Sequence, residues 1–174
     1  KKIKNILQIP DIWLIFAPIK QYRMKIAIQK ATELGVTKVI PCLTEYTNIK
    51  SVNINNLQLN AIEAAEQSER MDIPKIEKPI QLTELIHSWP DDRHLVYFNE
   101  KLKYEKNIME SLLPIKENNK KLAVLVGPEG GFSNSETELI TKGNNVISVS
   151  LGNRLLRSDT AITIALFCVQ EFLD

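Results

Sequence analysis

The sequence predicts an α/β domain built on a mostly parallel sheet. Strand-like apolar runs alternate with amphipathic, helix-like segments along 174 residues. The run 122–126 is apolar at every position, which is typical of a central parallel strand covered on both faces. Glycine-rich segments follow two of the predicted strands directly, and parallel sheets bind ligands at that edge. The length suits one domain with a substantial core.

The composition excludes several classes of protein. Charged residues make up 25% and apolar residues 44%, so a disordered chain, a collagen-like repeat and a disulfide scaffold are excluded. A net charge of +1 argues against a histone-like nucleic-acid binder but allows a local basic patch. No apolar run reaches the roughly 18 residues of a membrane span, so no membrane partner is predicted. Cys42 and Cys168 lie far apart, which favours free thiols in a reducing compartment.

The first half of the chain predicts two strands and two helices. Residues 12–17 form a strand that Pro18 closes, and residues 24–34 form a helix that Gly35 stops. Residues 36–43 form a second strand, whose end Pro41 places at a sheet edge. A helix capped by Asn55 or Asn56 runs to about Ser68.

The second half continues the alternation. Short helices are predicted over 83–89 and 104–113, and strands over 95–98, 122–126 and 147–151. Ser133 and Glu136 fit a capping box, so a helix begins there and stops at Gly143. Ser158 caps the last helix, 159–173. That helix is apolar almost all round, which predicts burial on more than one side.

Two glycine segments are the first candidates for a binding site. Residues 127–131 (Gly-Pro-Glu-Gly-Gly) and 151–154 (Leu-Gly-Asn-Arg) follow strands and should lie on one rim of the sheet. Neither matches a phosphate-binding glycine motif, and Glu129 would repel a phosphate. The loop therefore suits a neutral or cationic ligand. A tight turn leading into a capped helix explains the same spacing equally well.

Arginines are the second candidates. Arg154 and Arg157 stand before a buried helix, where a cation opposes the helix dipole, and such a cost is a mild sign of function. A pair of solvated surface arginines remains the alternative. Arg70 ends a predicted helix, where a basic residue ordinarily compensates the dipole. His87 and His94 have no partner at ligand spacing, so no metal is predicted, and no catalytic serine or cysteine triad is found.

Four segments resemble one known family. Residues 125–133 with Glu136 resemble the motif L-[IV]-G-P-E-G-G-[FW]-[ST]-x-x-E, and residues 150–161 resemble S-L-G-x-R-I-L-R-x-E-T-A. Residues 28–36 and 63–70 resemble Q-K-x-T-E-L-G-V and E-A-x-E-Q-S-x-R. These motifs belong to the ribosomal RNA small-subunit methyltransferase E family of the SPOUT class. The departures, such as Ser158-Asp159 in place of Thr-Glu, remove no motif glycine or arginine.

The resemblance implies a fold that composition and periodicity do not. It implies a SPOUT-type α/β domain with a deep trefoil knot near its C-terminus, a rare exception to the usual connection rules. It also implies a homodimer located in the cytoplasm. Residues 12–174 would be this methyltransferase domain, and residues 1–11 a residual linker from a missing N-terminal PUA-like domain.

The resemblance also implies an activity. The family uses S-adenosylmethionine to methylate N3 of a uridine in small-subunit (16S) ribosomal RNA. Arg154, Arg70 and Glu129 are the predicted catalytic residues, with cofactor orientation as the favoured role of Glu129. The predicted cofactor-binding residues are Leu125, Gly127, Pro128, Glu129, Gly130, Gly131, Ser150, Leu151, Gly152, Arg154, Leu155 and Leu156. The alternatives are a 2′-O-ribose methyltransferase of the same superfamily and a non-catalytic RNA-binding or assembly factor.

Overall fold

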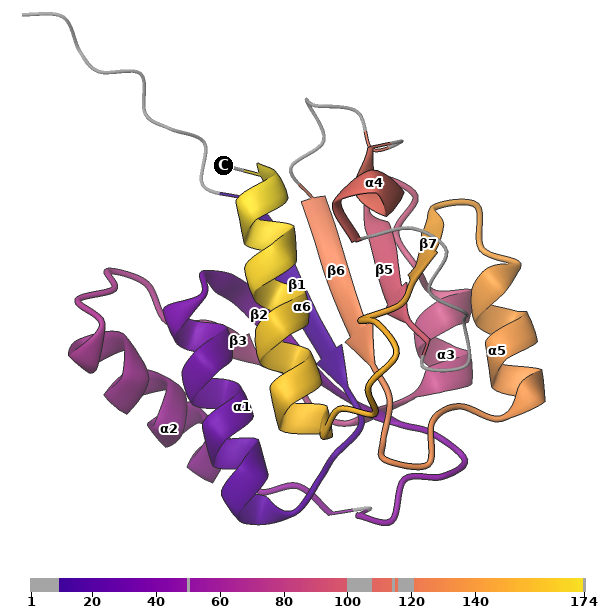
Figure 1. The fold of residues 1–174 in the computed structure, drawn as a ribbon. Coiled ribbons are helices and arrows are strands. Elements are labelled where there is room, and N and C mark those ends of the chain that lie inside the picture. Colours follow the sequence, from indigo (N-terminus) through magenta and orange to yellow (C-terminus); the bar gives the residue numbers. More distant parts are fainter. Residues whose placement is uncertain (1–9, 50, 100–107, 114, 116–120, 174) are drawn as a thin grey trace, which may run out of the picture.

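Seven strands form one sheet in the order β3-β2-β1-β6-β5-β7, with β4 also paired to β2 (Figure 1). The computed structural model describes residues 10–49, 51–99, 108–113, 115 and 121–173. Every pairing between its strands is parallel, which confirms the predicted class. The strands are β1 (Asp11–Phe16), β2 (Val36–Leu43), β3 (Lys75–Ile76), β4 (Ile80–Gln81), β5 (His94–Phe98), β6 (Lys121–Val126) and β7 (Val146–Val149).

Six helices cover the two faces of this sheet in the described part of the chain. They are α1 (Gln21–Glu33), α2 (Ile54–Gln67), α3 (Leu82–His87), α4 (Ile108–Leu112), α5 (Asn134–Thr141) and α6 (Ser158–Leu173). Of the helix predicted over 104–113, residues 104–107 lie outside the described residues. Pro114, its predicted end, lies outside them as well. No described helix has both the length and the apolar character that crossing a membrane requires.

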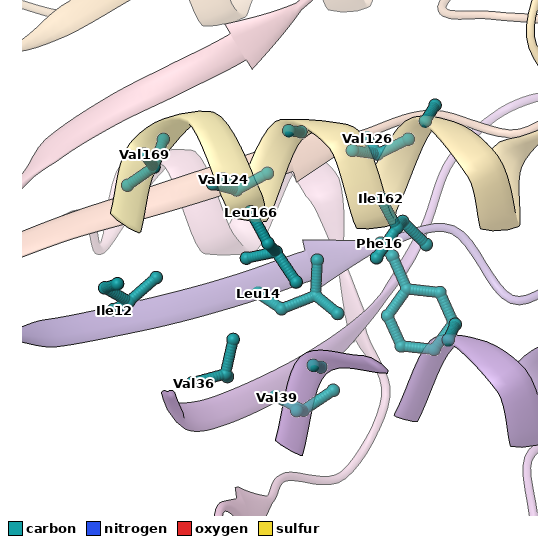
Figure 2. Packing of buried hydrophobic residues seen from close by; sticks show 14 of the residues in the cluster. Ile12, Leu14, Phe16, Val36, Val39, Val124, Val126, Ile162, Leu166 and Val169 are labelled. Carbon is teal, nitrogen blue, oxygen red and sulfur yellow. The ribbon is translucent and has the colours of Figure 1, made fainter. Parts of the chain in front are cut away.

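The central strand β6 divides its side chains between two cores. Leu122, Val124 and Val126 join a cluster with residues of α1, α2, α4 and α6. Ala123 and Leu125 join a second cluster with residues of α3 and α5. Successive side chains of a strand point to opposite faces, so a strand covered on both sides is apolar throughout. Figure 2 shows Val124 and Val126 beside Ile162 and Leu166 of α6.

Pro41 predicted that the end of strand β2 lies at an edge of the sheet, but β2 is an interior strand. It pairs with β1 on one side and with two short strands, β3 and β4, on the other. The outer pairing joins residues 38–39 to β3 and residues 42–43 to β4. It is therefore interrupted opposite Ile40 and Pro41. Proline lacks a backbone donor, and a break in the outer ladder accommodates it inside the sheet.

Local chemistry sets the ends of the helices. Asn53, rather than Asn55 or Asn56, caps α2, because its side chain accepts a hydrogen bond from the Asn56 amide at 3.0 Å. Ser133 and Glu136 form both halves of the predicted capping box of α5. Gly35 follows α1 with φ +79°, a conformation that side-chain-bearing residues rarely adopt.

Helix α6 is buried along one face rather than on several. Ala161, Ile162, Ala165, Leu166 and Val169 pack into the core. Ile164 is 37% exposed and Phe167 is 52% exposed on the other side of the same helix. An apolar sequence cannot distinguish a helix buried all round from one with an exposed apolar face, and α6 is of the second kind.

An ion-pair cluster ties the amino-terminal ends of four strands together. We call Asp11, Trp13, Thr37 and Arg93 the Arg93 cluster. Arg93 donates to the carboxylate of Asp11 and, from Nη1, to the carbonyls of Asp11 and Leu122 at 2.6 and 3.0 Å. The hydroxyl of Thr37 and the indole of Trp13 also donate to Oδ1 of Asp11, at 2.5 and 3.0 Å.

Aromatic contacts complete the Arg93 cluster. The Arg93 guanidinium lies 3.7 Å from the centre of the Trp13 ring, and Nζ of Lys38 lies 3.8 Å from it. Asp11 belongs to this structure, because β1 begins at Asp11 rather than at Ile12. Since Asp11, Thr37, Arg93 and Leu122 lie in or beside β1, β2, β5 and β6, the cluster fixes the edge of the sheet opposite the carboxyl ends of the strands.

Candidate functional site

A cavity of about 620 Å³ lies at the carboxyl ends of β5, β6 and β7. Backbone pairing holds these ends side by side: the Asn99 amide donates to the Val149 carbonyl at 3.0 Å, and Phe98 of β5 lies opposite Val126 of β6. The lining residues are Phe98, Asn99, Val126, Gly127, Pro128, Glu129, Gly131, Phe132, Ser150, Leu151, Gly152, Asn153, Arg154, Leu155, Leu156, Ser158 and Ala161.

The loop 127–133 is held by a buried carboxylate. Glu136 of α5 accepts the Ser133 amide on Oε2 at 2.9 Å and the Glu45 amide on Oε1 at 2.8 Å. Glu136 is 8% exposed, and both of its oxygens are used. The side chain thereby joins this loop to the segment that follows β2, and α5 supplies a rigid base for the loop.

The second loop, 150–157, begins with a turn that glycine makes possible. Gly152 has φ +98°, and its amide donates to Oγ of Ser150 at 3.3 Å. Leu151 and Leu156 pack at the border of the core and give the cavity apolar walls. Together the loops present backbone polar groups and apolar surface, the combination that small-molecule sites use.

Gly127 is required by a close contact in the first loop, and we expect Gly127→Ala to lower both stability and affinity for a ligand of the cavity. An added Cβ would lie 2.6 Å from Cε2 of Phe132. The Phe132 ring is buried and packs edge-on against Tyr97, with ring centres 5.1 Å apart, so it cannot turn away. Such overpacking costs about 1–3 kcal/mol, which urea unfolding measures.

The matched control for this prediction is Gly130→Ala. Its Cβ would lie 3.3 Å from Cβ of Tyr46, whose side chain is exposed and free to give way. We expect a smaller loss of stability in this variant than in Gly127→Ala. Equal unfolding free energies for the two variants would contradict the packing argument.

Charged side chains surround the mouth of the cavity. We call Tyr22, Arg23, Glu129 and Arg157 the rim cluster. Nη1 of Arg23 donates to Oε1 of Glu129 at 2.8 Å, and Nε of Arg23 donates to the Tyr22 hydroxyl at 2.9 Å. Nη2 of Arg157 donates to the same hydroxyl at 3.2 Å. Arg154 lines the cavity nearby and makes no hydrogen bond or ion pair with any residue that the structure describes.

The structure brings most of the predicted site residues together. Both glycine loops lie on the same rim, as expected for loops that follow parallel strands. The predicted residues that line the cavity are Gly127, Pro128, Glu129, Gly131, Ser150, Leu151, Gly152, Arg154, Leu155 and Leu156.

Three predicted site residues do not line this cavity. Leu125 points into the opposite core with α3 and α5, because side chains alternate along β6; its neighbour Val126 lines the cavity instead. Gly130 lies against Tyr46 on the outside of its loop. Arg70 binds both oxygens of Asp72 at 2.9 and 2.6 Å and the Thr32 carbonyl at 2.7 Å.

The contact with Thr32 explains where Arg70 lies. Helix α1 starts just after the carboxyl end of β1 and ends just before β2 begins, so Thr32, near its end, lies toward the amino-terminal edge of the sheet. The cavity lies at the opposite edge. In this structure Arg70 joins the ends of α1 and α2, in keeping with the alternative role of a basic residue at a helix end.

A third wall of the cavity has no mark in the sequence. Phe98 and Asn99 end β5, which lies between β6 and β7 in the sheet. No glycine marks this strand end, so the only available signal was its place in the alternation of strands. The other lining residues outside the predicted set are Val126, Phe132, Asn153, Ser158 and Ala161.

The described residues were compared with the requirements of a metal site and of a reactive thiol. Among them, no three His, Cys, Asp or Glu side chains gather where they could hold a metal ion. Cys42 and Cys168 are both free. Burial, reinforced by the charge of Glu136, raises the pKa of the Cys42 thiol to about 12, so this thiol is not a nucleophile at neutral pH.

Comparison with known proteins identifies the class to which this parallel sheet and two-loop cavity belong, the RNA methyltransferase domains. The model of the RNA methyltransferase domain family matches residues 7–170, which is most of the chain. A ribosomal RNA small subunit methyltransferase E of Rickettsia conorii is 40% identical over 153 residues, covering 88% of this chain and 61% of that protein. The protein of that name from Buchnera aphidicola subsp. Schizaphis graminum is 32% identical over 180 residues, covering 98% and 69%.

The chain belongs to the ribosomal RNA small subunit methyltransferase E family. It spans less than two thirds of the Rickettsia protein, at 61% of its length. The crystal structure of a member from Neisseria gonorrhoeae bound to S-adenosyl methionine has a TM-score of 0.82 and 26% identity to this chain. The match covers 93% of this chain and 66% of that one.

Proposed function

We propose that this protein uses S-adenosylmethionine to methylate N3 of a uridine in small-subunit (16S) ribosomal RNA, in the cytoplasm and without a metal ion. The observation that carries the proposal is that two family motifs, separated in the sequence by α5 and β7, line one cavity. The crystal structure of the Neisseria relative contains the same cofactor.

The residues around the cavity suit this cofactor. Its volume of about 620 Å³ falls in the range of small-molecule sites. The glycine loops bring backbone donors and acceptors close to a ligand, and Val126, Leu151 and Leu156 offer an apolar surface for an adenine ring. Glu129 brings a carboxylate to the mouth, where Arg23 holds Oε1, and Oε2 is available to a sulfonium cation.

The chemistry divides between the cofactor and the protein. S-adenosylmethionine would supply a methyl group from its sulfonium and leave as S-adenosylhomocysteine, while N3 of uridine would release its proton to solvent as it accepts the methyl group. Arg154 has no ion-pair partner in the described chain, so its guanidinium is available to stabilise negative charge on the uracil oxygens. Glu129 orients the cofactor from the other wall. Alignment of donor and acceptor then supplies much of the rate enhancement.

We also propose that the two cofactor loops belong to a trefoil knot. The path of the chain supports this. After β7 at the edge of the sheet, the chain returns through 150–157, and α6 then packs on β6 and α1, on the other side of β5. This return passes the loop 127–133, with which it shares the cavity.

We further propose a homodimer, and we expect Phe167→Asp to convert it to a monomer. Helices α1 and α6 pack together, and Ile26, Ile164 and Phe167 are exposed on them. Apolar side chains exposed in this way are typical of a protein interface, and a buried carboxylate would oppose association. Light scattering measures the mass. The control is Met71→Asp, at an exposed methionine outside both helices. A monomeric wild type, or a dimeric Phe167→Asp, would contradict this proposal.

Three measurements on the purified protein test the proposed activity. Calorimetry with S-adenosylmethionine tests the cofactor, and transfer of a labelled methyl group to small subunits or their RNA tests the reaction. Nucleoside analysis of the product then identifies the methylated atom. N3-methyluridine supports the proposal, a 2′-O-methylated nucleoside would replace it with the ribose methyltransferase, and absent cofactor binding would favour a non-catalytic RNA-binding factor.

A further inference from the structure

We propose that Tyr22 and Arg23, in the first turn of α1, are positioning residues that hold the two cofactor loops at a fixed spacing. This inference rests on the proposed function, because it names the residues that prepare the same cavity for its cofactor. Neither residue lines the cavity. Each acts through a residue of one loop: Arg23 through Glu129, and Tyr22 through Arg157.

The need for such a connection follows from the sheet. The loop 127–133 leaves β6 and the loop 150–157 leaves β7, and β5 lies between these two strands. β6 and β7 each pair with β5 and not with each other, so their ends are joined only through β5. The first turn of α1 contacts both loops, since Arg23 binds Glu129 and the Tyr22 hydroxyl binds Arg157, whose neighbours Leu156 and Ser158 line the cavity.

The two contacts are themselves coupled. The guanidinium of Arg23 donates to Glu129 from Nη1 and to the Tyr22 hydroxyl from Nε, so one rigid fork orients both partners. The Arg23 side chain is largely buried, whereas Tyr22 is 58% exposed. A lysine at position 23 could not serve two acceptors in this fixed geometry.

The charges of the rim cluster explain why a phenol suits position 22. Its oxygen accepts hydrogen bonds from two guanidinium groups that would otherwise repel each other. The hydrogen bond from Arg23 and the charges of Arg23 and Arg157 lower the pKa of Tyr22 below its ordinary value. The carboxylates of Glu129 and Asp159 add negative charge around Arg23 and favour its charged form.

The functional consequence is preorganisation. A cofactor that touches both loops binds more tightly when the spacing of the loops is set beforehand, because less ordering remains to be done on binding. The protein thereby keeps Glu129 at the cavity mouth and holds the loop that carries Arg154 in place. Loss of the Tyr22 hydroxyl should weaken cofactor binding without removing a group that contacts the cofactor.

Tyr22→Phe tests the inference, because it removes only the oxygen that both arginines bind. We expect the Kd and KM for S-adenosylmethionine to rise about three- to tenfold, with kcat at saturating cofactor and the thermal midpoint almost unchanged. The control is Tyr46→Phe, a second exposed tyrosine, which lies beside Gly130 of the first loop and does not line the cavity. The Tyr46 hydroxyl makes no hydrogen bond with the described residues. The affinity of Tyr46→Phe for S-adenosylmethionine should therefore match that of the wild type.

A double-mutant cycle with Arg157→Gln identifies the coupling. If Tyr22 acts through Arg157, the double variant binds the cofactor no more weakly than the weaker single variant. Additive losses would overturn this coupling, and an unchanged Kd in Tyr22→Phe would overturn the whole inference. A wild type that binds no S-adenosylmethionine would overturn the proposed function as well, so the two failures are distinguishable.

Discussion

Arg154→Ala is expected to lower kcat for methyl transfer about 10²–10³-fold and to leave the fold unchanged. Arg154 lines the cavity, and it makes no hydrogen bond or ion pair with other described residues. Its removal therefore costs no hydrogen bond or ion pair, while in the proposed reaction the charge on the uracil oxygens loses a stabilising cation. Transfer of a labelled methyl group to small-subunit RNA measures the rate. Urea unfolding should show a change within about 0.5 kcal/mol.

Arg70→Ala is the informative comparison, because the sequence nominated both arginines. Arg70 binds Asp72 and the Thr32 carbonyl, so its loss should act on stability rather than on kcat. A strong fall in kcat for Arg70→Ala, with unchanged turnover for Arg154→Ala, would reverse the assignment of the two residues. Arg154→Lys adds a second test, since a lysine keeps the charge but loses the planar fork.

Asp11→Ala is expected to destabilise the protein by about 3 kcal/mol, the largest stability effect that we predict. The variant leaves Arg93, whose side chain is 3% exposed, without its carboxylate partner. The estimate takes the lower end of the range for a broken buried ion pair, because Asp11 is itself 38% exposed. Trp13 contacts both residues, so its fluorescence follows the unfolding transition.

The control for Asp11 is Asp92→Ala at the same end of the sheet. Asp92 pairs with Lys121 on the surface, and exposed pairs of this kind contribute about 0–1 kcal/mol. Asp11→Asn separates charge from shape, because an amide retains an acceptor for Thr37 or Trp13. Unfolding free energies for Asp11→Ala and Asp92→Ala that agree within error would refute the importance of the Arg93 cluster.

The carboxylate of Asp11 should also make the stability of the fold sensitive to acid. Burial alone would raise the pKa of Asp11, but hydrogen bonds from Thr37 and Arg93 and the charge of Arg93 outweigh it and lower the pKa. A carboxylate with a lowered folded-state pKa stabilises the protein above its unfolded value of about 3.9. That contribution disappears as the pH falls through the folded-state pKa. The wild type should lose this stabilisation as the pH falls from the unfolded-state pKa through the folded-state pKa of Asp11. The Asp11→Asn variant should lack this stabilisation at every pH.

The regular elements were predictable where the sequence carries a strong period or a specific cap. Strand β2 has the predicted bounds, 36–43, because Gly35 stops the preceding helix and apolar residues dominate the run. The start of α5 was predictable from Ser133 and Glu136, which satisfy each other's amides. Strands β3 and β4 contain two residues each, which is too few to show a period, so the sequence does not predict them.

The site was predictable where glycine marks it and was missed elsewhere. Gly127 and Gly152 identify the two loops, whereas the end of β5 carries no such residue. Arg93 stands among Asp91, Asp92 and His94, a composition typical of an exposed turn. Only the fold shows that its guanidinium enters the sheet and binds carbonyls there. Long-range contacts of this kind leave no local signal in one sequence.

The order in which the walls of the cavity occur along the chain has a consequence for synthesis. Loops 127–133 and 150–157 and Ala161 of α6 all come from the last third of the sequence. On the ribosome, strands β1 and β2 and helices α1 and α2 therefore emerge well before any pocket exists. The pocket forms only when the final helix has docked on β6 and α1. A small molecule that fills it then binds only chains in which α6 has docked, and by mass action it protects them from unfolding.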